Sequence, residues 1–262
     1  MIKKRGIHMH FDEYHGKTIF VTGAASGIGQ AQAIAFAKQG ANVLGMDIDE
    51  HGLAETTTHT DNTAGTFCSF KGDVTKEKDI VSAVNKANEQ FGAIHILLNT
   101  AGILDDYTPT LETTETLWDR ILAVNLKGTF LVTNNVLPQM ITQKHGVIIN
   151  MASIAGMVAG GGGAAYTASK HAIIGYTKQL DHDYIKQGIR ANAIAPGAIQ
   201  TPMNAADFAG DGKMAEWVAN ETPAGRWAKP EEVAALTLFL ASKQADYIHG
   251  TVMPIDGGWL EK

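Results

Sequence analysis

Thr18-Ile-Phe-Val-Thr-Gly-Ala-Ala-Ser-Gly-Ile-Gly29 is the stretch that decides the fold. Its first five residues, Thr18 to Thr22, are apolar or β-branched, which is typical of a short buried strand. The glycines at 23, 27 and 29 then permit a tight turn, and a helical pattern follows from about Ser26 to Gln39. A strand that turns through glycines into a helix opens a parallel α/β sheet. The free N–H groups at such a helix start favour an anion such as pyrophosphate.

The same alternation of strand and helix continues along the chain. We expect further buried strands at residues 41–47, 94–98, 146–151 and 189–194. We expect helices over about 112–137, 164–187 and 230–241, and another that ends at Gly92. Strands that are apolar on both faces and alternate with helices imply a parallel sheet covered on both sides. The sequence therefore predicts one α/β domain over residues 16–262, a Rossmann-type doubly wound sheet of about seven strands.

Asp47 ends the second expected strand, twenty residues beyond Gly27. A carboxylate at that place can accept hydrogen bonds from both ribose hydroxyls of an adenosine and repels a 2′-phosphate. The neighbouring residues Met46, Ile48 and Asp49 supply no arginine or lysine that would bind such a phosphate. The sequence thus favours NAD(H) over NADP(H) as the bound dinucleotide, although NADP(H) stays open.

Tyr166 and Lys170 lie four residues apart in Tyr-Thr-Ala-Ser-Lys, thirteen residues after Ser153. Positions i and i+4 share one face of a helix, so the ammonium can approach the ring. A phenol ordinarily has a pKa near ~10, and a fixed cation nearby can lower that pKa by roughly 1–3 units. The pair suits a residue that gives a proton to a carbonyl or takes one from an alcohol.

In this order, the glycine turn, Ser153 and Tyr166-x-x-x-Lys170 resemble the short-chain dehydrogenase/reductase family from about Gly16 to Gly258. Further segments match family motifs: Asp73-Val74, Asn99-Thr-Ala-Gly102, Asn125, Pro196-Gly-Ala-Ile-Gln-Thr201 and Asp256-Gly-Gly258. Thr100 replaces the second asparagine of the Asn-Asn-Ala-Gly motif, which puts one local hydrogen bond in doubt.

The resemblance implies a role for each matching residue. Tyr166 would be the general acid or base, Lys170 would lower the pKa of Tyr166 and bind the nicotinamide ribose, and Ser153 would hold the substrate oxygen. Asn125 would hold a water that relays protons from Lys170. The implied cofactor contacts are Gly23, Ser26, Gly27, Ile28, Gly29, Asp47, Asp73, Val74, Asn99, Ala101, Gly102, Tyr166, Lys170, Pro196, Gly197, Ile199 and Thr201. The family also implies a homo-oligomer, a tetramer or dimer, built through the helices at 112–137 and 164–187.

Composition excludes several other classes of protein. A formal charge of −6 argues against nucleic acid as the main partner. No apolar run approaches the ~18 residues that a membrane span needs, and no secretory signal is recognisable, so we expect no membrane partner. The single cysteine, Cys68, fits a reducing compartment, and we expect a cytoplasmic protein. The ten histidines show no metal-ligand spacing, so we expect no metal. We expect residues 1–15 to form a flexible tail.

Three segments are expected to border the substrate. Residues 202–222 follow the nicotinamide segment and contain Gly210 and Gly212, which suits a lid that excludes water. Residues 103–107 and 156–164 flank the catalytic residues, and the second of these holds a run of four glycines. Arg226 and Lys229 are candidates for binding a phosphate, but a structural ion pair is the favoured interpretation.

Three functions fit this sequence. The first is an NAD(H)-dependent oxidoreductase for a small or medium secondary alcohol or ketone, for instance a polyol, a sugar or an acetoin-like diol. The second is a 3-oxoacyl-(acyl-carrier-protein) reductase of fatty-acid synthesis, which the pattern also resembles and against which Asp47 argues. The third is a dinucleotide-sensing module without turnover, which the intact Ser153, Tyr166 and Lys170 disfavour.

Overall fold

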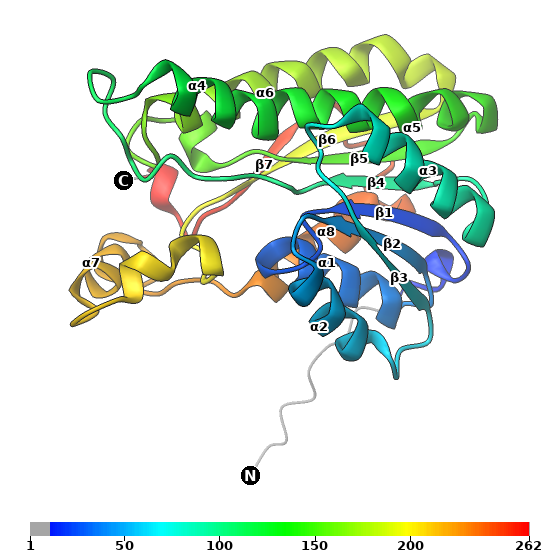
Figure 1. The fold of residues 1–262 in the computed structure, drawn as a ribbon, viewed down its shortest axis with the longest axis horizontal. Coiled ribbons are helices and arrows are strands. Elements are labelled where there is room, and N and C mark those ends of the chain that lie inside the picture. The colour runs from blue at the N-terminus through cyan, green and yellow to red at the C-terminus, as the bar shows by residue number, and fades with distance from the viewer. Residues whose placement is uncertain (1–10, 262) are drawn as a thin grey trace.

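The computed structural model describes residues 11–261, in which seven parallel strands form one sheet (Figure 1). The strands lie in the order β3-β2-β1-β4-β5-β6-β7. Their bounds are β1 (Thr18–Thr22), β2 (Asn42–Asp47), β3 (Thr66–Lys71), β4 (Ile96–Asn99), β5 (Gly146–Met151), β6 (Ile189–Pro196) and β7 (Val252–Ile255). The order reverses direction between β1 and β4, and ligands of such sheets bind at this switch point. The expected Rossmann-type fold is confirmed.

Helices cover both faces of the sheet (Figure 1). The helices α3 (Glu77–Phe91), α4 (Glu115–Leu122), α5 (Thr129–Gln143) and α6 (Ala164–Tyr184) lie on one face. The helices α1 (Gly27–Lys38), α2 (Glu50–Thr60) and α8 (Pro230–Ala241) lie on the other. The short helix α7 (Lys213–Glu221) stands apart, beyond the end of the sheet at which the strands finish (Figure 1).

The two largest hydrophobic clusters of the described residues result from the alternation of side chains along each strand. Ile19 and Val21 on β1 belong to the core under α1 and α8, and Phe20 between them belongs to the core under α3 and α5. All five residues of β1 are buried. Strands of this kind carry apolar side chains at consecutive positions because both faces are covered.

The edge strands β3 and β7 were not located from the sequence. Their residues are mostly half-buried, and Thr66 and Lys71 at the ends of β3 are exposed. Each edge strand has one neighbour only, so its sequence lacks the continuous apolar run that marks the central strands.

The helix expected over 112–137 proved to be three pieces. Helix α4 begins at Glu115, a π-helical segment spans Ala123–Gly128, and α5 continues to Gln143. The backbone stays helical throughout this region, so side-chain periodicity alone could not reveal the widened turn.

The predicted boundary of the tail at residue 15 is wrong. Phe11 and Tyr14 are buried, and the Tyr14 ring packs 4.9 Å from the ring centroid of Phe36. The Tyr14 hydroxyl also donates a hydrogen bond to the Leu238 carbonyl in α8. Residues 11–15 are therefore part of the packed domain, and residues 1–10 of the expected tail lie outside the described residues.

Candidate active site

The glycine turn between β1 and α1 has no room for side chains. Gly23 and Gly27 have φ angles of +73° and +53°, a conformation that other residues rarely adopt. A Cβ on Gly23 would approach the backbone of Ala101 to 2.9 Å, and one on Gly29 would lie 2.0 Å from the Gly23 carbonyl oxygen. Bare backbone at the start of α1 therefore faces the space beyond β1, which suits a pyrophosphate.

Asp47 lies beside this turn at the end of β2. Its carboxylate accepts hydrogen bonds from the backbone N–H groups of Ala25 and Asp49, each at 3.0 Å. Asp47 and Ile48 both line the cavity described next. The structure thus holds a carboxylate next to the glycine turn, as the sequence predicts for an adenosine ribose site.

A cavity of about 1050 Å³ runs along the ends of the strands. Sixteen of the seventeen residues predicted to contact the cofactor line it, and the catalytic candidate Ser153 lines it as well. The sixteen are Gly23, Ser26, Gly27, Ile28, Gly29, Asp47, Asp73, Val74, Ala101, Gly102, Tyr166, Lys170, Pro196, Gly197, Ile199 and Thr201.

 Asn99 is the one predicted cofactor contact outside this lining. The catalytic candidate Asn125 is also outside it. Residues from distant parts of the sequence are therefore brought to one cavity.

Asn99 faces the core instead of the cavity. Its side-chain amide donates to the Thr133 hydroxyl at 3.0 Å and to the side-chain oxygen Oδ1 of Asn150 at 2.9 Å. Asn150 in turn donates to the Thr177 hydroxyl at 2.9 Å. This chain of buried amides ties β4 and β5 to α5 and α6, so the side chain of Asn99 supports the strand ends, and its predicted contact with the cofactor stays a prediction.

Asn125 lies in the π-helical segment, directly behind the cavity wall. Its amide donates to the Ile103 carbonyl at 3.0 Å and to the Ser169 hydroxyl at 3.2 Å, and its oxygen accepts from the Ile103 N–H at 2.8 Å. A Cβ on Gly102 would lie 3.3 Å from the Asn125 oxygen and 3.6 Å from Lys170 Nζ. Asn125 thus joins the loop after β4 to α6, close to Lys170.

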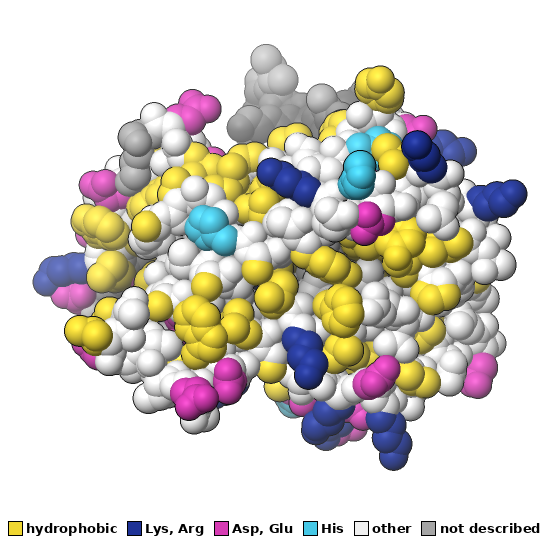
Figure 2. Space-filling model, turned by 90° about the horizontal axis from the view of Figure 1, so that it is seen from above, with side chains coloured by type: hydrophobic (Ala, Val, Ile, Leu, Met, Phe, Trp, Pro, Cys, Tyr) yellow, Lys and Arg dark blue, Asp and Glu magenta, His cyan; other side chains and the backbone are white. Residues whose placement is uncertain are grey.

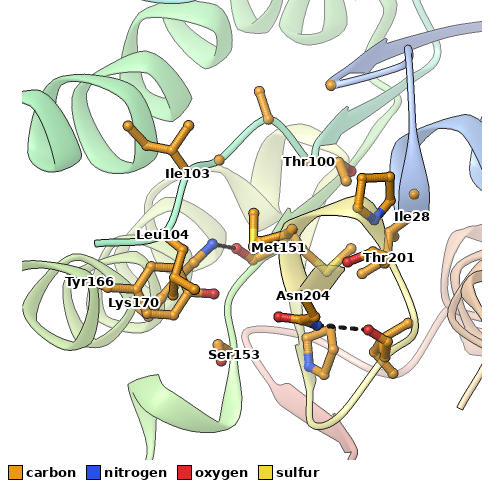
Figure 3. A pocket seen from close by; sticks show the side chains of 18 of the residues that line it. Ile28, Thr100, Ile103, Leu104, Met151, Ser153, Tyr166, Lys170, Thr201 and Asn204 are labelled. Carbon is orange, nitrogen blue, oxygen red and sulfur yellow. Dashed lines mark hydrogen bonds between the residues drawn. The ribbon is translucent and has the colours of Figure 1, made fainter. Parts of the chain in front are cut away.

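Ser153, Tyr166 and Lys170 meet on one wall of the cavity (Figure 3). Ser153 follows β5, and Tyr166 and Lys170 lie on the first turns of α6. The Lys170 ammonium lies 5.4 Å from the centroid of the Tyr166 ring and donates to the Met151 carbonyl at 2.7 Å. The i, i+4 spacing therefore places the cation against the ring, as expected.

Burial is the main cause of the pKa shifts of Tyr166 and Lys170. It raises the pKa of Tyr166 to about 12, against the lowering effect of a hydrogen bond with Ser153. Burial also lowers the pKa of Lys170 to about 8. In this structure the Lys170 ammonium is directed at the Met151 carbonyl, and the lowering of the Tyr166 pKa by its charge stays a prediction.

The sequence reasoning missed Asp105. This buried carboxylate accepts hydrogen bonds from the Gly163 and Tyr166 N–H groups, each at 2.8 Å, and so caps the start of α6 from another loop. The next two residues, Asp106 and Tyr107, have positive φ angles of 50° and 56°. Only the fold brings this loop to α6, so no local spacing in the sequence could have marked Asp105 as a cap.

The three segments expected at the substrate end do border the cavity. Ile103, Leu104 and Tyr107 line it from the loop after β4, and Gly160 and Gly161 line it from the glycine run. The lining residues from 202–222 are Pro202, Met203, Asn204, Asp207, Met214, Trp217 and Val218. Figure 3 shows Asn204 on the side of the cavity opposite Ile103.

Other side chains considered from the sequence have structural partners. Arg226 forms a two-point ion pair with Glu232, at 2.7 and 2.8 Å, which agrees with the structural interpretation. In residues 11–261, no cluster of three or more His, Cys, Asp or Glu side chains could hold a metal ion. No helix in the described part of the chain is long and apolar enough to cross a membrane.

Comparisons with known proteins cover nearly the whole chain. A family model described as enoyl-(acyl carrier protein) reductase matches residues 23–260. The chain is 40% identical over 243 residues to the 3-oxoacyl-(acyl-carrier-protein) reductase of Thermotoga maritima, which covers 93% of this chain and 97% of that protein.

Solved structures agree with this match. The crystal structure of levodione reductase has a TM-score of 0.90 at 35% identity, over 94% of this chain and 98% of that one. A Beutenbergia cavernae protein, named as an NAD(P)-dependent gluconate 5-dehydrogenase with bound NADP, has a TM-score of 0.88 at 34% identity, over 95% and 98%. The chain therefore belongs to the short-chain dehydrogenase/reductase family, oxidoreductases that act on alcohols and ketones with a nicotinamide cofactor.

Proposed function

We propose that this protein is an NAD(H)-dependent oxidoreductase that interconverts a secondary alcohol and a ketone, with Tyr166 as general acid and base. The convergence of Ser153, Tyr166 and Lys170 on a cavity that also contains the glycine turn and Asp47 carries the proposal. A nicotinamide cofactor, when bound, supplies the hydride acceptor for oxidation or the hydride donor for reduction.

The residues at the other end of the cavity fit a dinucleotide. Gly23, Gly27 and Gly29 leave the backbone bare where a Cβ would otherwise fill the turn. The start of α1 adds N–H donors and the positive end of the helix dipole, both of which stabilise a pyrophosphate. Asp47 would hold the ribose hydroxyls, and its charge supports NAD(H) over NADP(H).

Ser153, Tyr166 and Lys170 can together transfer one proton to or from the substrate. In reduction, the Tyr166 hydroxyl gives its proton to the carbonyl oxygen of the substrate and becomes a phenolate; in oxidation the transfer runs in reverse. The Ser153 hydroxyl donates to the same oxygen and stabilises its developing charge. Lys170, with a pKa of about 8, stays mostly protonated at pH 7, so its charge stabilises the phenolate.

A 3-oxoacyl-(acyl-carrier-protein) reductase is the second candidate. The 40% identity to the Thermotoga maritima enzyme of that name supports it. Two features weigh against it: Asp47 disfavours NADP(H), and Arg226, a candidate for binding a phosphate, is engaged by Glu232. Comparing turnover of acetoacetyl thioester with that of simple ketones, each with NADH and NADPH, separates the two functions.

The variant Tyr166→Phe tests the catalytic assignment. Removing the hydroxyl removes the proton donor, so we expect kcat to fall by about 10²–10⁴-fold. Fluorescence titration is expected to show that NADH still binds. The exposed Tyr247→Phe is the control and is expected to match the unmodified protein. Full turnover by Tyr166→Phe would refute the proposed mechanism.

The variant Asp47→Asn tests the cofactor assignment. It removes the negative charge but keeps an acceptor for the Ala25 N–H. We expect the ratio of the NADPH and NADH dissociation constants to fall by about tenfold, since the repulsion of the 2′-phosphate is lost. Asp61→Asn, at an exposed carboxylate beyond α2, is the control. A preference of the unmodified protein for NADPH would contradict this assignment.

A further inference from the structure

The substrate end of the cavity is framed by three segments, which we call the rim segments: residues 100–114, 152–163 and 202–222. Each rim segment contributes residues to the lining of the cavity that also contains Ser153 and Tyr166. Trp227 and Trp259 line the cavity as well. The chemistry of these segments indicates which ketones or alcohols can enter.

Exposed hydrophobic side chains gather in the rim segments. Fourteen large hydrophobic side chains are exposed in residues 11–261. Eight of them belong to the rim segments: Tyr107, Leu111, Met157, Val158, Met203, Phe208, Met214 and Trp217. Met214 and Trp217, each 54% exposed, both line the cavity. Figure 2, which looks down on the side of the molecule that carries α4, α5 and α6, shows hydrophobic side chains reaching the surface in several places. Apolar surface concentrated around a cavity is typical of a ligand-binding site.

Most side chains that line the cavity from the rim segments are apolar, and several polar groups of the cavity wall are engaged within the protein. Asn204 donates to the Ile199 carbonyl at 2.7 Å, and the Trp227 indole donates to the Ala215 carbonyl at 2.8 Å. A polyol placed against Met203, Met214 and Trp217 would lose its hydrogen bonds to water without gaining replacements. Such unpaired hydroxyls weaken binding.

Most charged side chains of the rim segments are acidic. The rim segments contain seven acidic residues: Asp105, Asp106, Glu112, Asp207, Asp211, Glu216 and Glu221. Their one basic residue, Lys213, pairs with Asp211 at 2.6 Å. Among the residues that line the cavity, the cations are Lys170, which donates to Met151, and Arg120 on α4. An acidic rim repels a carboxylate, sulfonate or phosphate that approaches it.

We infer that the substrate of this site is an uncharged ketone or secondary alcohol with an apolar body, such as a substituted ring, and not a polyol, a sugar acid or a phosphate-bearing thioester. This inference rests on the proposed oxidoreductase function and narrows its substrate class. The reacting oxygen meets Ser153 and Tyr166, and the apolar body packs against Met203, Met214 and Trp217.

A matched set of ketones tests the inference with the full-length protein. The set contains cyclohexanone, 4-tert-butylcyclohexanone, 4-methylcyclohexanone, 4-oxocyclohexanecarboxylate, protonated 4-piperidone and fructose, each assayed with NADH and NADPH. We expect kcat/KM for 4-methylcyclohexanone to exceed that for 4-oxocyclohexanecarboxylate by at least about tenfold at low salt, with a smaller difference at high salt. We expect 4-tert-butylcyclohexanone to be the best substrate of the set.

Two variants locate the apolar contact. Met214→Ala and Trp217→Ala change exposed side chains on α7, so the fold is expected to persist. Each is expected to lower the ratio of kcat/KM for 4-tert-butylcyclohexanone to that for cyclohexanone by about tenfold. Tyr247→Ala, a fully exposed aromatic residue outside the rim segments, is the control and is expected to leave the ratio unchanged.

The outcomes separate this inference from the function on which it rests. If no ketone of the set and no acetoacetyl thioester is turned over with either cofactor, the proposed function fails. If ketones are turned over but the carboxylate, 4-piperidone or fructose is preferred, the function stands and the inference is overturned. An unchanged substrate ratio in both α7 variants would also overturn it.

Discussion

Tyr166 depends on a residue that is distant in the sequence. Its backbone N–H donates to Asp105, which also accepts from Gly163, so one buried carboxylate fixes the first turn of α6. A catalytic side chain misplaced by about 1 Å can cost ~10²-fold in rate. Asp105 therefore acts through Tyr166 as a positioning residue, while its neighbour Tyr107 lines the cavity.

The variant Asp105→Ala tests this positioning role. It leaves two N–H groups without their acceptor, so we expect kcat to fall by about 10–10²-fold and the free energy of unfolding by about 2–4 kcal/mol. We expect Asp105→Asn, which can still accept from one N–H, to recover part of both losses. The matched control is Asp106→Asn, an exposed neighbour whose positive φ suits asparagine. If kcat, assayed well below the melting temperature, is normal in Asp105→Ala, the residue is only structural.

At the scale of elements, the end of α8 shows how a buried helix terminus is stabilised. Arg190, on β6, is buried and donates to the Leu240 carbonyl and, at 2.9 Å, to the Ser242 carbonyl. The last carbonyls of a helix have no partner within the helix and carry partial negative charge, so a guanidinium satisfies both needs. This contact ties α8 to the sheet at the end opposite the cavity.

Replacing Arg190 tests the contribution of this contact to stability. In Arg190→Leu the carbonyls lose their donor inside the protein, so we expect the free energy of unfolding to fall by about 2–4 kcal/mol. Urea denaturation measures the change. Lys186→Leu, an exposed cation four residues earlier, is the control and is expected to change the free energy by less than about 0.5 kcal/mol. Equal losses in the two variants would contradict a specific role for Arg190.

In the molecule as a whole, the two ends of the sheet have different roles. The carboxyl ends of the strands hold the cavity, while the opposite ends are closed by structural contacts such as the bond from the Thr18 N–H to His95 Nδ1 at 3.1 Å. Burial, together with the charges of Lys17 and His145, lowers the pKa of His95 to about 4. His95 is therefore an uncharged acceptor that joins β4 to β1 at neutral pH.

This arrangement predicts a loss of stability in acid. In the unfolded chain, His95 has a pKa near ~6.5, so between about pH 6.5 and 4 the unfolded state binds a proton that the folded state does not. The free energy of unfolding is expected to fall by roughly 1–2 kcal/mol from this group as the pH drops through that window. Urea midpoints at several pH values measure the slope.

His95→Asn is the informative variant for this prediction. Asparagine keeps an acceptor for the Thr18 N–H but does not titrate, so the slope with pH is expected to be shallower. The exposed His51→Asn is the matched control and is expected to keep the original slope. An unchanged slope in His95→Asn would rule out His95 as a source of the acid sensitivity.

The central strands, the glycine turn, the acid after β2 and the pair of Tyr166 and Lys170 could be predicted from the residues alone. These features are local: a turn needs glycines at set positions, and a helix brings i and i+4 together whatever surrounds it. For this reason the expected positions of β1, α1, α6 and α8 agree closely with the structure.

Other features follow from contacts between distant segments, and only the fold reveals them. It buried Phe11 and Tyr14, turned Asn99 towards the core, brought Asp105 to the start of α6 and directed Lys170 at Met151. It also decided the titration of the catalytic pair, since the pKa of a side chain follows its burial and its neighbours. Such effects depend on packing between segments far apart in the chain, which no local pattern of residues encodes.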